Sequence, residues 1–371
     1  MKEYIDLLQK ILDEGVEKES GRENMPNTIG ISKSDIKMDL SKGFPLLTTK
    51  KMYWKGIIHE LLWFLRGETN IKYLVDNKVN IWNSDAYRWY LKYAEEENCP
   101  IQILYHNGFD GKGEYKEIRP FTKEEFIEKI KEQEDIVFLD LHYSTSKYVL
   151  GDLGKVYGHQ WRNQNGVDQI KDVLDGLKSN PYSRYHIIDG WNKADFPEMA
   201  LPPCHLLYQF IVRPLSVEDR WDLFQNIDWK EPLNMTSTSD DELHRICDEH
   251  NIPKFYLDLN LYQRSCDAGC GIPFNLTSMS LFLMIIAKSS NMVAGIANWI
   301  GGDTHLYLNH LDAVKEQITR TPMKLPKMII NKDLNSLDDI LNLNIEDFEL
   351  IEYESYPTIK YELFVGLVNK S

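Results

Sequence analysis

Apolar residues recur at three- and four-residue steps in the segments 4–12, 54–65 and 167–177. That spacing predicts three amphipathic helices, the first ending near Gly15 and the second buried on most sides. Glu60 stands beside the apolar stripe of the second helix, where an unpaired carboxylate is costly to bury. This helix therefore carries a polar group that core packing alone does not explain.

Two other segments predict strands. Residues 206–212 are β-branched and aromatic, which is typical of a buried strand, and residues 255–261 alternate apolar with polar side chains, which is typical of a half-buried one. A short apolar run at 136–139 predicts a further strand. Helices and strands mixed in this way indicate one α/β (α+β) domain that spans 1–371.

Charged residues dominate two stretches, about 91–149 and 214–253, which we interpret as surface insertions in that domain. The first contains a capping box at Thr122 and Glu125, which predicts the start of a short solvated helix. The second contains another capping box, at Ser239 and Glu242.

The composition narrows the classes of function. A chain of 371 residues that is 43% hydrophobic can bury a large core, and its formal net charge of −15 argues against a nucleic-acid-binding surface. We find no signal peptide at the N-terminus and no run of about 18 apolar residues that would span a membrane. We therefore expect a cytoplasmic protein that binds neither nucleic acid nor membrane.

Cys204 follows Pro202 and Pro203 and directly precedes the first predicted strand. Two prolines fix φ and lack N–H donors, so the chain reaches Cys204 in a rigid conformation outside any ladder. A thiol with a fixed direction is placed to react, although a lone cysteine is more often a small buried apolar residue. The five cysteines are an odd number and do not suggest a disulfide framework.

Polar residues gather at other points of the chain. Arg264, Ser265 and Asp267 follow the second predicted strand, where they indicate an edge that binds a phosphate or a ring. The segment 271–275 predicts a turn that delivers the amide of Asn275 into a helix, and residues 301–310 predict a polar loop-to-helix junction. Cys266 and Cys270 lack a second pair of ligands, so we expect no metal.

Six ordered motifs resemble the thymidylate synthase family of pyrimidine-nucleotide C5 one-carbon transferases. They are Gly43-Phe44-Pro45-Leu46, His59-Glu60-Leu61-Leu62-Trp63-Phe64-Leu65, Gly151-Asp152-Leu153-Gly154, Pro202-Pro203-Cys204-His205, Gln263-Arg264-Ser265 with Asp267, and Asp303-Thr304-His305-Leu306-Tyr307. The resemblance implies that family's fold, a large mixed twisted sheet flanked by helices, here with the two charged insertions. It also implies a homodimer, with dUMP and a reduced folate, 5,10-methylenetetrahydrofolate, as ligands.

The resemblance implies a role for each matching residue. Cys204 matches the nucleophile that adds to C6 of uracil, and a nearby cation such as Arg264 favours its thiolate. Glu60 and Tyr157 match the groups that organise proton transfer at C4 and C5. The remaining matches are Arg22, Arg184, Arg264 and Ser265 to the phosphate (Arg184 across the dimer), Asn275 to the pyrimidine, His305 and Tyr307 to the sugar hydroxyl, and Trp82 and Asp267 to the folate.

The chain also departs from the family pattern at several positions. It has Tyr185 in place of a second arginine, Met279 in place of a tyrosine, the small turn Ala268–Gly269–Cys270, Asn83–Asp85 in place of a second tryptophan, and an atypical tail at 361–371. These changes lie mostly on the folate side, where an open site would admit a water that captures the methylene carbon. We therefore expect a phage-type dUMP 5-hydroxymethylase, in the host cytoplasm if phage-encoded.

Two alternatives remain open. One is a thymidylate synthase that makes dTMP and dihydrofolate by reductive methylation. The other is a non-catalytic relative that acts as a scaffold, against which the retained Cys204, Arg264 and Asn275 argue. A Cys–His hydrolase is excluded, because the adjacent side chains Cys204 and His205 would point to opposite faces of a strand.

Overall fold

A mixed β-sheet is the largest feature of the computed structural model, which describes residues 1–20, 25–96, 120–132, 149–225 and 239–362. The strands of this sheet are β1 (Val16–Lys18), β2 (Thr28–Ile31), β3 (Ser34–Asp39), β4 (Ile187–Asp189), β5 (His205–Pro214), β6 (Phe255–Asp267) and β7 (Val293–Tyr307). Their order is β1-β2-β7-β6-β5-β4, with β3 also paired to β7. β6 and β7 run parallel and the other pairs antiparallel, which confirms the expected mixed sheet.

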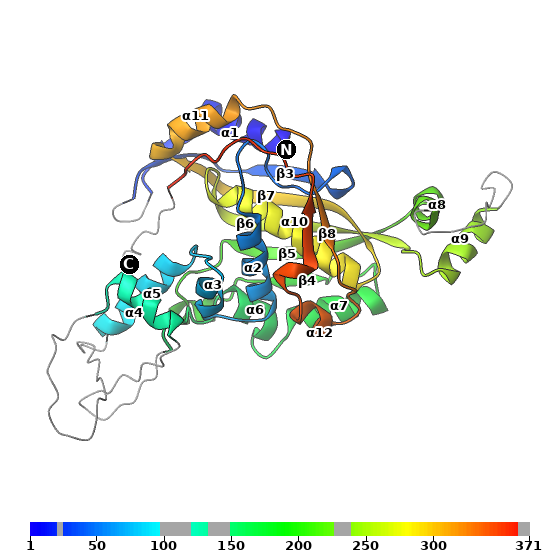
Figure 1. The fold of residues 1–371 in the computed structure, drawn as a ribbon, viewed down its shortest axis with the longest axis horizontal. Coiled ribbons are helices and arrows are strands. Elements are labelled where there is room, and N and C mark those ends of the chain that lie inside the picture. Colours follow the sequence, from blue (N-terminus) through cyan, green and yellow to red (C-terminus); the bar gives the residue numbers. More distant parts are fainter. Residues whose placement is uncertain (21–24, 97–119, 133–148, 226–238, 363–371) are drawn as a thin grey trace, which may run out of the picture.

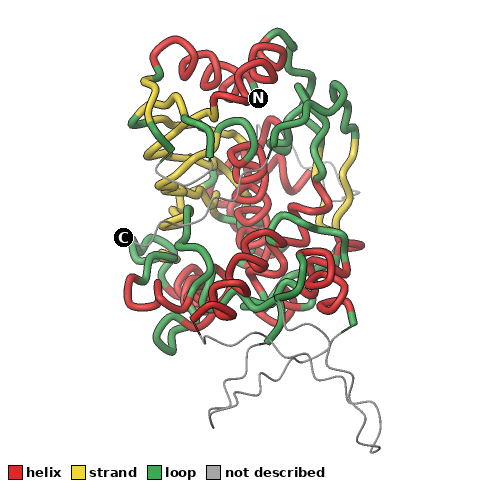
Figure 2. Tube along the Cα trace, turned by 90° about the vertical axis from the view of Figure 1, so that its left-hand side faces the viewer, coloured by secondary structure: helices red, strands yellow, loops and turns green. Residues whose placement is uncertain are grey.

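Most of the helices lie on one side of this sheet, as Figure 2 shows. The helices of the described segments are α1 (Lys2–Glu14), α2 (Trp54–Leu65), α3 (Lys72–Asp76), α4 (Asn83–Glu96), α5 (Lys123–Lys131), α6 (Tyr157–Asn163), α7 (Gln169–Ser179), α8 (Val217–Gln225), α9 (Asp240–Glu249), α10 (Gly271–Ser289), α11 (Leu311–Ile318) and α12 (Leu337–Leu341). A separate two-stranded antiparallel sheet pairs β8 (Lys327–Ile330) with β9 (Phe348–Ile351). The three helices predicted from apolar spacing are α1, α2 and α7.

α10 is the central helix of the core and packs on β6, β7 and α2 (Figure 1). It is long and apolar enough to cross a membrane by length and composition, but 72% of its apolar window is buried inside the fold. The helix begins at Gly271, so the segment 271–275 is its first turn rather than a separate turn. Pro273 is tolerated there because the N–H groups of a first turn have no acceptor within the helix.

The two central strands are longer than the sequence predicts. β6 continues through Asp267 and β7 through Tyr307, so residues 263–267 and 301–307 are strand and not a strand exit and a loop. Their parallel pairing places Ser265 beside Asp303 and Asp267 beside His305. The ladder supplies backbone partners for both segments, which is why their polar residues do not end the strands.

The charged stretches fold in two different ways. α8 and α9 project from the body (Figure 1) and enclose a small core of their own that includes Trp221 and Cys247. α5 begins at the predicted Thr122 capping box, but it is not a solvated helix, because Phe126 and Ile130 are buried in the main core. Its charges cover only the outer face. The strand predicted at 136–139 lies outside the described residues.

The sheet face that points away from α10 carries apolar side chains in contact with solvent. Ile211 on β5 is 41% exposed and Tyr262 on β6 is 48% exposed. Ile296 and Ile300 on β7 are partly exposed as well. A face of this kind is unusual for a side of a sheet that meets only water.

Candidate functional site

Cys204 lies at the mouth of β5, held by backbone hydrogen bonds on both sides. Its N–H donates to the hydroxyl of Tyr157 on α6 at 2.7 Å, and its carbonyl accepts from the N–H of Arg264 at 2.8 Å. The side chain is partly exposed, and none of the four cysteines in the described segments forms a disulfide with another of them. The thiol is therefore accessible and fixed in direction, as the two preceding prolines predicted.

Arg264 of β6 braces the segment that carries this thiol. Its Nε donates to Pro203 O at 2.8 Å, and its Nη2 donates to Pro202 O at 2.9 Å. The same Nη2 lies 3.9 Å from Cys204 Sγ, where a positive charge favours a thiolate. The guanidinium also stacks over Trp191, with its carbon 5.6 Å from the ring centroid. The sequence predicted a positive charge near Cys204. It did not predict that Arg264 would hold the proline segment by hydrogen bonds, or that Trp191 would pack against the guanidinium.

Asn275, in the first turns of α10, meets Gln263 of β6. Its Oδ1 accepts from Gln263 Nε2 at 3.0 Å. His205 lies on the other side, where burial lowers its pKa to about 4 against an opposing hydrogen bond to Asn275. The His205 ring pairs with the Tyr208 hydroxyl at 3.0 Å. A neutral His205 thus belongs to a group of polar side chains with Asn275 and Tyr208.

Glu60, the carboxylate on the apolar helix α2, has a hydrogen-bond partner inside the fold. The indole N–H of Trp82 donates to Glu60 Oε1 at 2.7 Å. Burial nevertheless raises the pKa of Glu60 to about 7, with this hydrogen bond opposing the shift. Burial also raises the pKa of Tyr157 well above its ordinary value, and the Tyr157 ring lies 6.0 Å from that of Trp82. The two predicted proton-transfer groups therefore lie around one aromatic cluster.

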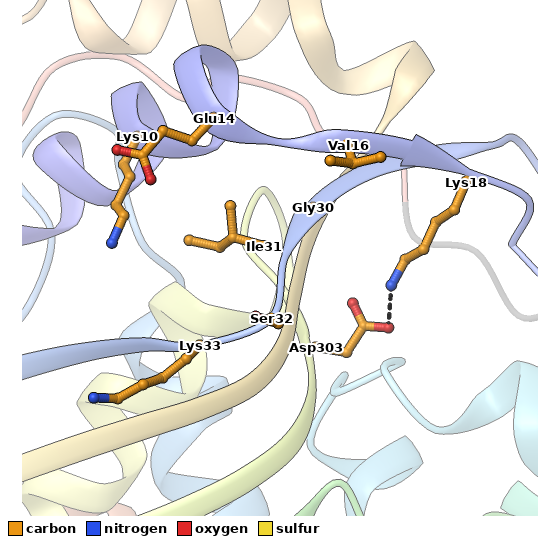
Figure 3. Close-up of a pocket in the computed structure, with 9 residues that line it drawn as sticks. All are labelled: Lys10, Glu14, Val16, Lys18, Gly30, Ile31, Ser32, Lys33 and Asp303. Atoms are coloured by element: carbon orange, nitrogen blue, oxygen red, sulfur yellow. Dashed lines mark hydrogen bonds and ion pairs between the residues drawn. The ribbon is translucent and has the colours of Figure 1, made fainter.

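His305 of β7 is oriented by Asp303 from the same strand. Its Nδ1 lies 3.1 Å from Asp303 Oδ1, and because a carboxylate only accepts, Nδ1 carries the proton. The hydrogen bond from His305, with a second from Lys18, lowers the pKa of Asp303 to about 2. Figure 3 shows Lys18 reaching Asp303 at the rim of a surface pocket of ≈ 670 Å³. Tyr307 is buried against His305, at 5.4 Å between ring centroids.

Asp267 ends β6 at the turn Ala268–Gly269–Cys270. Its Oδ1 accepts from the N–H groups of Gly269 and Cys270 at 3.0 and 3.1 Å. Beneath the turn, the buried Lys50 donates to Gly269 O at 2.8 Å, and burial lowers the pKa of Lys50 to about 8.

The ring of Tyr361 covers this turn from the C-terminal segment. Its centroid lies 4.1 Å from Lys50 Nζ, and its hydroxyl donates to Gln317 at 2.7 Å. A Cβ on Gly269 would lie 2.8 Å from Tyr361 Cδ1. The space left by the small turn is thus filled by a residue far away in the chain, which no local pattern predicts.

Two of the predicted phosphate-binding arginines are not found near Cys204 in the described chain. Arg184 is exposed on the loop before β4, and Arg22 lies outside the described residues. Ser265 stands next to Arg264 on β6, and its carbonyl accepts from Gln263 Nε2 at 3.0 Å. Within the described segments, no group of three or more His, Cys, Asp or Glu side chains could hold a metal ion.

Besides Trp191 and Tyr361, sequence reasoning missed Lys50 and the function of Gln263. Lys50 was visible as one lysine of a Thr-Thr-Lys-Lys segment, with nothing to mark it as buried. Gln263 was part of a quoted motif, but its function depends on Trp299, which only the pairing of β6 with β7 brings near.

Comparison with known proteins identifies the family of this chain. The family model described as thymidylate synthase matches residues 2–365. The thymidylate synthase of Mycoplasma mobile is 40% identical over 365 residues, which cover 98% of this chain and 100% of the relative. Those of Mycoplasma pneumoniae and the aster yellows witches'-broom phytoplasma are each 38% identical over 367 residues, with the same coverage. The chain belongs to the thymidylate synthase family and is a folate-dependent transferase whose co-substrate is 5,10-methylenetetrahydrofolate.

Proposed function

We propose that this protein converts dUMP to dTMP, with dihydrofolate as the second product. The observation that carries the proposal is the Cys204 thiol, fixed by Tyr157 and 3.9 Å from the Arg264 guanidinium. The relatives that match over nearly the whole chain are named thymidylate synthases. They give no support to the expected dUMP hydroxymethylase, so the alternative of reductive methylation is the better proposal.

The chemistry begins at the sulfur. The Cys204 thiolate adds to C6 of the uracil ring, and the electron pair of the C5–C6 double bond moves toward C5 and O4. C5 then bonds to the methylene carbon of the folate and loses its proton, and the bond between that carbon and the folate nitrogen breaks, which leaves a methylene group double-bonded to C5. A hydride adds to this methylene, the C5–C6 double bond re-forms, and Cys204 leaves C6 as a thiolate. The folate supplies both that carbon and that hydride, which leaves it as dihydrofolate.

Glu60 and Tyr157 are suited to the proton transfers. With a pKa of about 7, Glu60 carries a proton in a large fraction of molecules at neutral pH and can give or take it through the site. Tyr157 stays a neutral hydroxyl because its pKa is raised, and it can relay a proton near C5 and C6. Asn275 would pair with N3–H and O4, since one amide offers both an acceptor and a donor.

The other polar residues would hold the nucleotide. Arg264 and Ser265 would bind the phosphate together with Arg22 and with Arg184 of a second copy, since guanidinium groups match phosphate oxygens in pairs. His305 and Tyr307 would bind the sugar hydroxyl. Because Asp303 holds Nδ1 of His305, Nε2 is the ring nitrogen left to face the sugar hydroxyl.

Trp82 and Asp267 would form the folate side of the site, as an aromatic wall and a carboxylate. The expectation of an open folate side rested partly on the small turn at Gly269. The Tyr361 ring fills that space, which supports a closed site in which hydride transfer outcompetes water.

We propose that the protein acts as a cytoplasmic homodimer. The exposed apolar face with Ile211 and Tyr262 is a surface that a second copy would cover. Arg184 lies at the edge of this face, where its carbonyl is 3.5 Å from the side chain of Gln209 on β5. Burying the face would therefore bring Arg184 toward the partner.

Incubation with dUMP and 5,10-methylenetetrahydrofolate tests the proposal. We expect dihydrofolate to accumulate in step with dTMP, identified by mass spectrometry, and Cys204→Ser to abolish both. A product heavier by one oxygen, with tetrahydrofolate left unoxidised, would instead identify a hydroxymethylase. Absence of both nucleotide products from the folded protein would support the scaffold.

A further inference from the structure

Two buried polar side chains lie behind Asn275, and the proposed reaction uses neither. Trp299 on β7 and Gln263 on β6 are 0% and 4% exposed. The Trp299 indole donates to Gln263 Oε1 at 2.7 Å, and Gln263 Nε2 donates to Asn275 Oδ1 at 3.0 Å. The same Nε2 donates to Ser265 O at 3.0 Å.

These contacts leave the Gln263 amide one orientation. An indole N–H can only donate and a backbone carbonyl can only accept, so Trp299 must face Oε1 and Ser265 O must face Nε2. Turning the amide over would set two acceptors against each other and leave a buried N–H facing another. Gln263 therefore presents a donor to Asn275, which in turn must direct Oδ1 toward it.

The strand pairing explains how the indole reaches this position. Leu261 is the partner of Trp299, and Gln263 that of Gly301, in the parallel β6–β7 ladder. Gly301 leaves room for the ring, because a Cβ there would lie 2.4 Å from Trp299 Cη2. The indole can thus lie along β7 and reach the side chain opposite Gly301.

We propose that Trp299 and Gln263 are positioning residues that make the site select uracil over cytosine. This inference rests on the proposed function, because Asn275 must be the residue that contacts the base. Uracil offers N3–H and an O4 acceptor, which match Asn275 Oδ1 and Nδ2. Cytosine offers an acceptor at N3 and a donor at N4, so it requires the Asn275 amide to turn over. That turn would place Nδ2 against Gln263 Nε2, donor against donor.

Two substitutions test the inference through the ratio of kcat/KM for dUMP to that for dCMP. Trp299→Phe keeps a ring but removes the donor, and we expect the ratio to fall about tenfold, the effect of one buried hydrogen bond. With its carboxyl group ionised, at alkaline pH, Gln263→Glu can accept from Trp299 but cannot donate to Asn275, so it favours the turned amide. We expect a larger fall in that variant, together with measurable binding of dCMP in titrations without folate.

Trp63→Phe is the matched control, because Trp63 is equally buried and its indole donates to Asn70 O at 2.8 Å, away from Asn275. It should lower thermal stability to a similar extent and leave the ratio unchanged. An unchanged ratio in folded Gln263→Glu overturns the inference, whether or not Trp299→Phe folds. Failure of the proposed function looks different, because the wild-type protein itself would then show no turnover of dUMP.

Discussion

Trp82 donates its indole N–H to Glu60 Oε1 at 2.7 Å, so the one carboxylate on the apolar helix α2 is partnered by a buried ring. This hydrogen bond favours the charged carboxylate, while burial disfavours it more strongly. The result is a raised pKa of about 7. A group that is half-protonated at neutral pH is suited to proton transfer, which the first prediction tests.

Glu60→Gln should lower kcat by roughly 10²–10⁴-fold, the usual range for loss of a general acid or base. It should also change the dependence of stability on pH. The folded protein holds a proton on Glu60 up to about pH 7, whereas an unfolded glutamate loses it near pH 4.3. Wild-type stability therefore falls as the pH rises between these values, and the glutamine variant should lack that loss.

Urea unfolding at pH 4 and pH 8, with initial rates at pH 7, measures both effects. Glu68→Gln is the control, because burial also raises the pKa of Glu68 but this residue lies outside the proposed site. We expect the control to retain kcat. An active Glu60→Gln enzyme would contradict the assigned role.

Asp303→Asn should raise KM for dUMP, because His305 exchanges the charged acceptor that fixes its Nδ1 proton for a neutral and weaker one. Its effect on stability has the opposite sign of pH dependence. The pKa of Asp303 is lowered to about 2, against about 3.9 in an unfolded chain. Its stabilising contribution is present above pH 4 and disappears as the pH falls toward 2, so the asparagine variant should lose less stability on acidification.

Acid unfolding curves and nucleotide KM values check this prediction. Asp39→Asn is a matched control, since a hydrogen bond from Ser41 lowers the pKa of Asp39 at a position distant from the site. The control should alter acid stability without altering KM. Equal KM values for all three proteins would remove His305 from the nucleotide site.

Tyr361→Ala should raise KM for 5,10-methylenetetrahydrofolate about fivefold, which corresponds to roughly 1 kcal/mol for a partly buried cation–π contact. The ring covers Lys50 and the Gly269 turn next to Asp267. Tyr361→Phe keeps the ring and loses only the hydrogen bond to Gln317, so its KM should change less. Steady-state kinetics with varied folate give these values.

Tyr356→Ala serves as the control for Tyr361→Ala, because the Tyr356 ring packs on Arg320 at 5.4 Å, in the same C-terminal segment. Its folate KM should stay at the wild-type value. If both alanine variants show the same KM, the Tyr361 ring has no specific place in the folate site.

Mixing two inactive variants tests whether Arg184 serves a partner's site. Cys204→Ser and Arg184→Ala should each have little activity alone. If the chain is a dimer with shared sites, random exchange of subunits places both lesions in one site of a hybrid and leaves the other intact, which restores about a quarter of wild-type activity. No recovery after exchange, confirmed by mass spectrometry of the hybrid, would place Arg184 outside the partner's site.

The sequence by itself determined the helices and caps that depend only on neighbouring residues. Apolar spacing predicted α1, α2 and α7, because one face of each must be buried at three- and four-residue steps. Local patterns also identified Glu60, because it interrupts the apolar face of a helix. They identified Cys204 as rigidly held, because two prolines precede it. Local patterns also predicted the Thr122 cap that begins α5.

Only the tertiary structure decided which distant residues meet. Parallel pairing of β6 with β7 places Trp299 behind Gln263, and the C-terminal segment brings Tyr361 over Gly269. It also buries one side of α5, although its charges predicted a solvated helix. Side-chain periodicity reports which face of an element is apolar, but it carries no information about which other element covers that face.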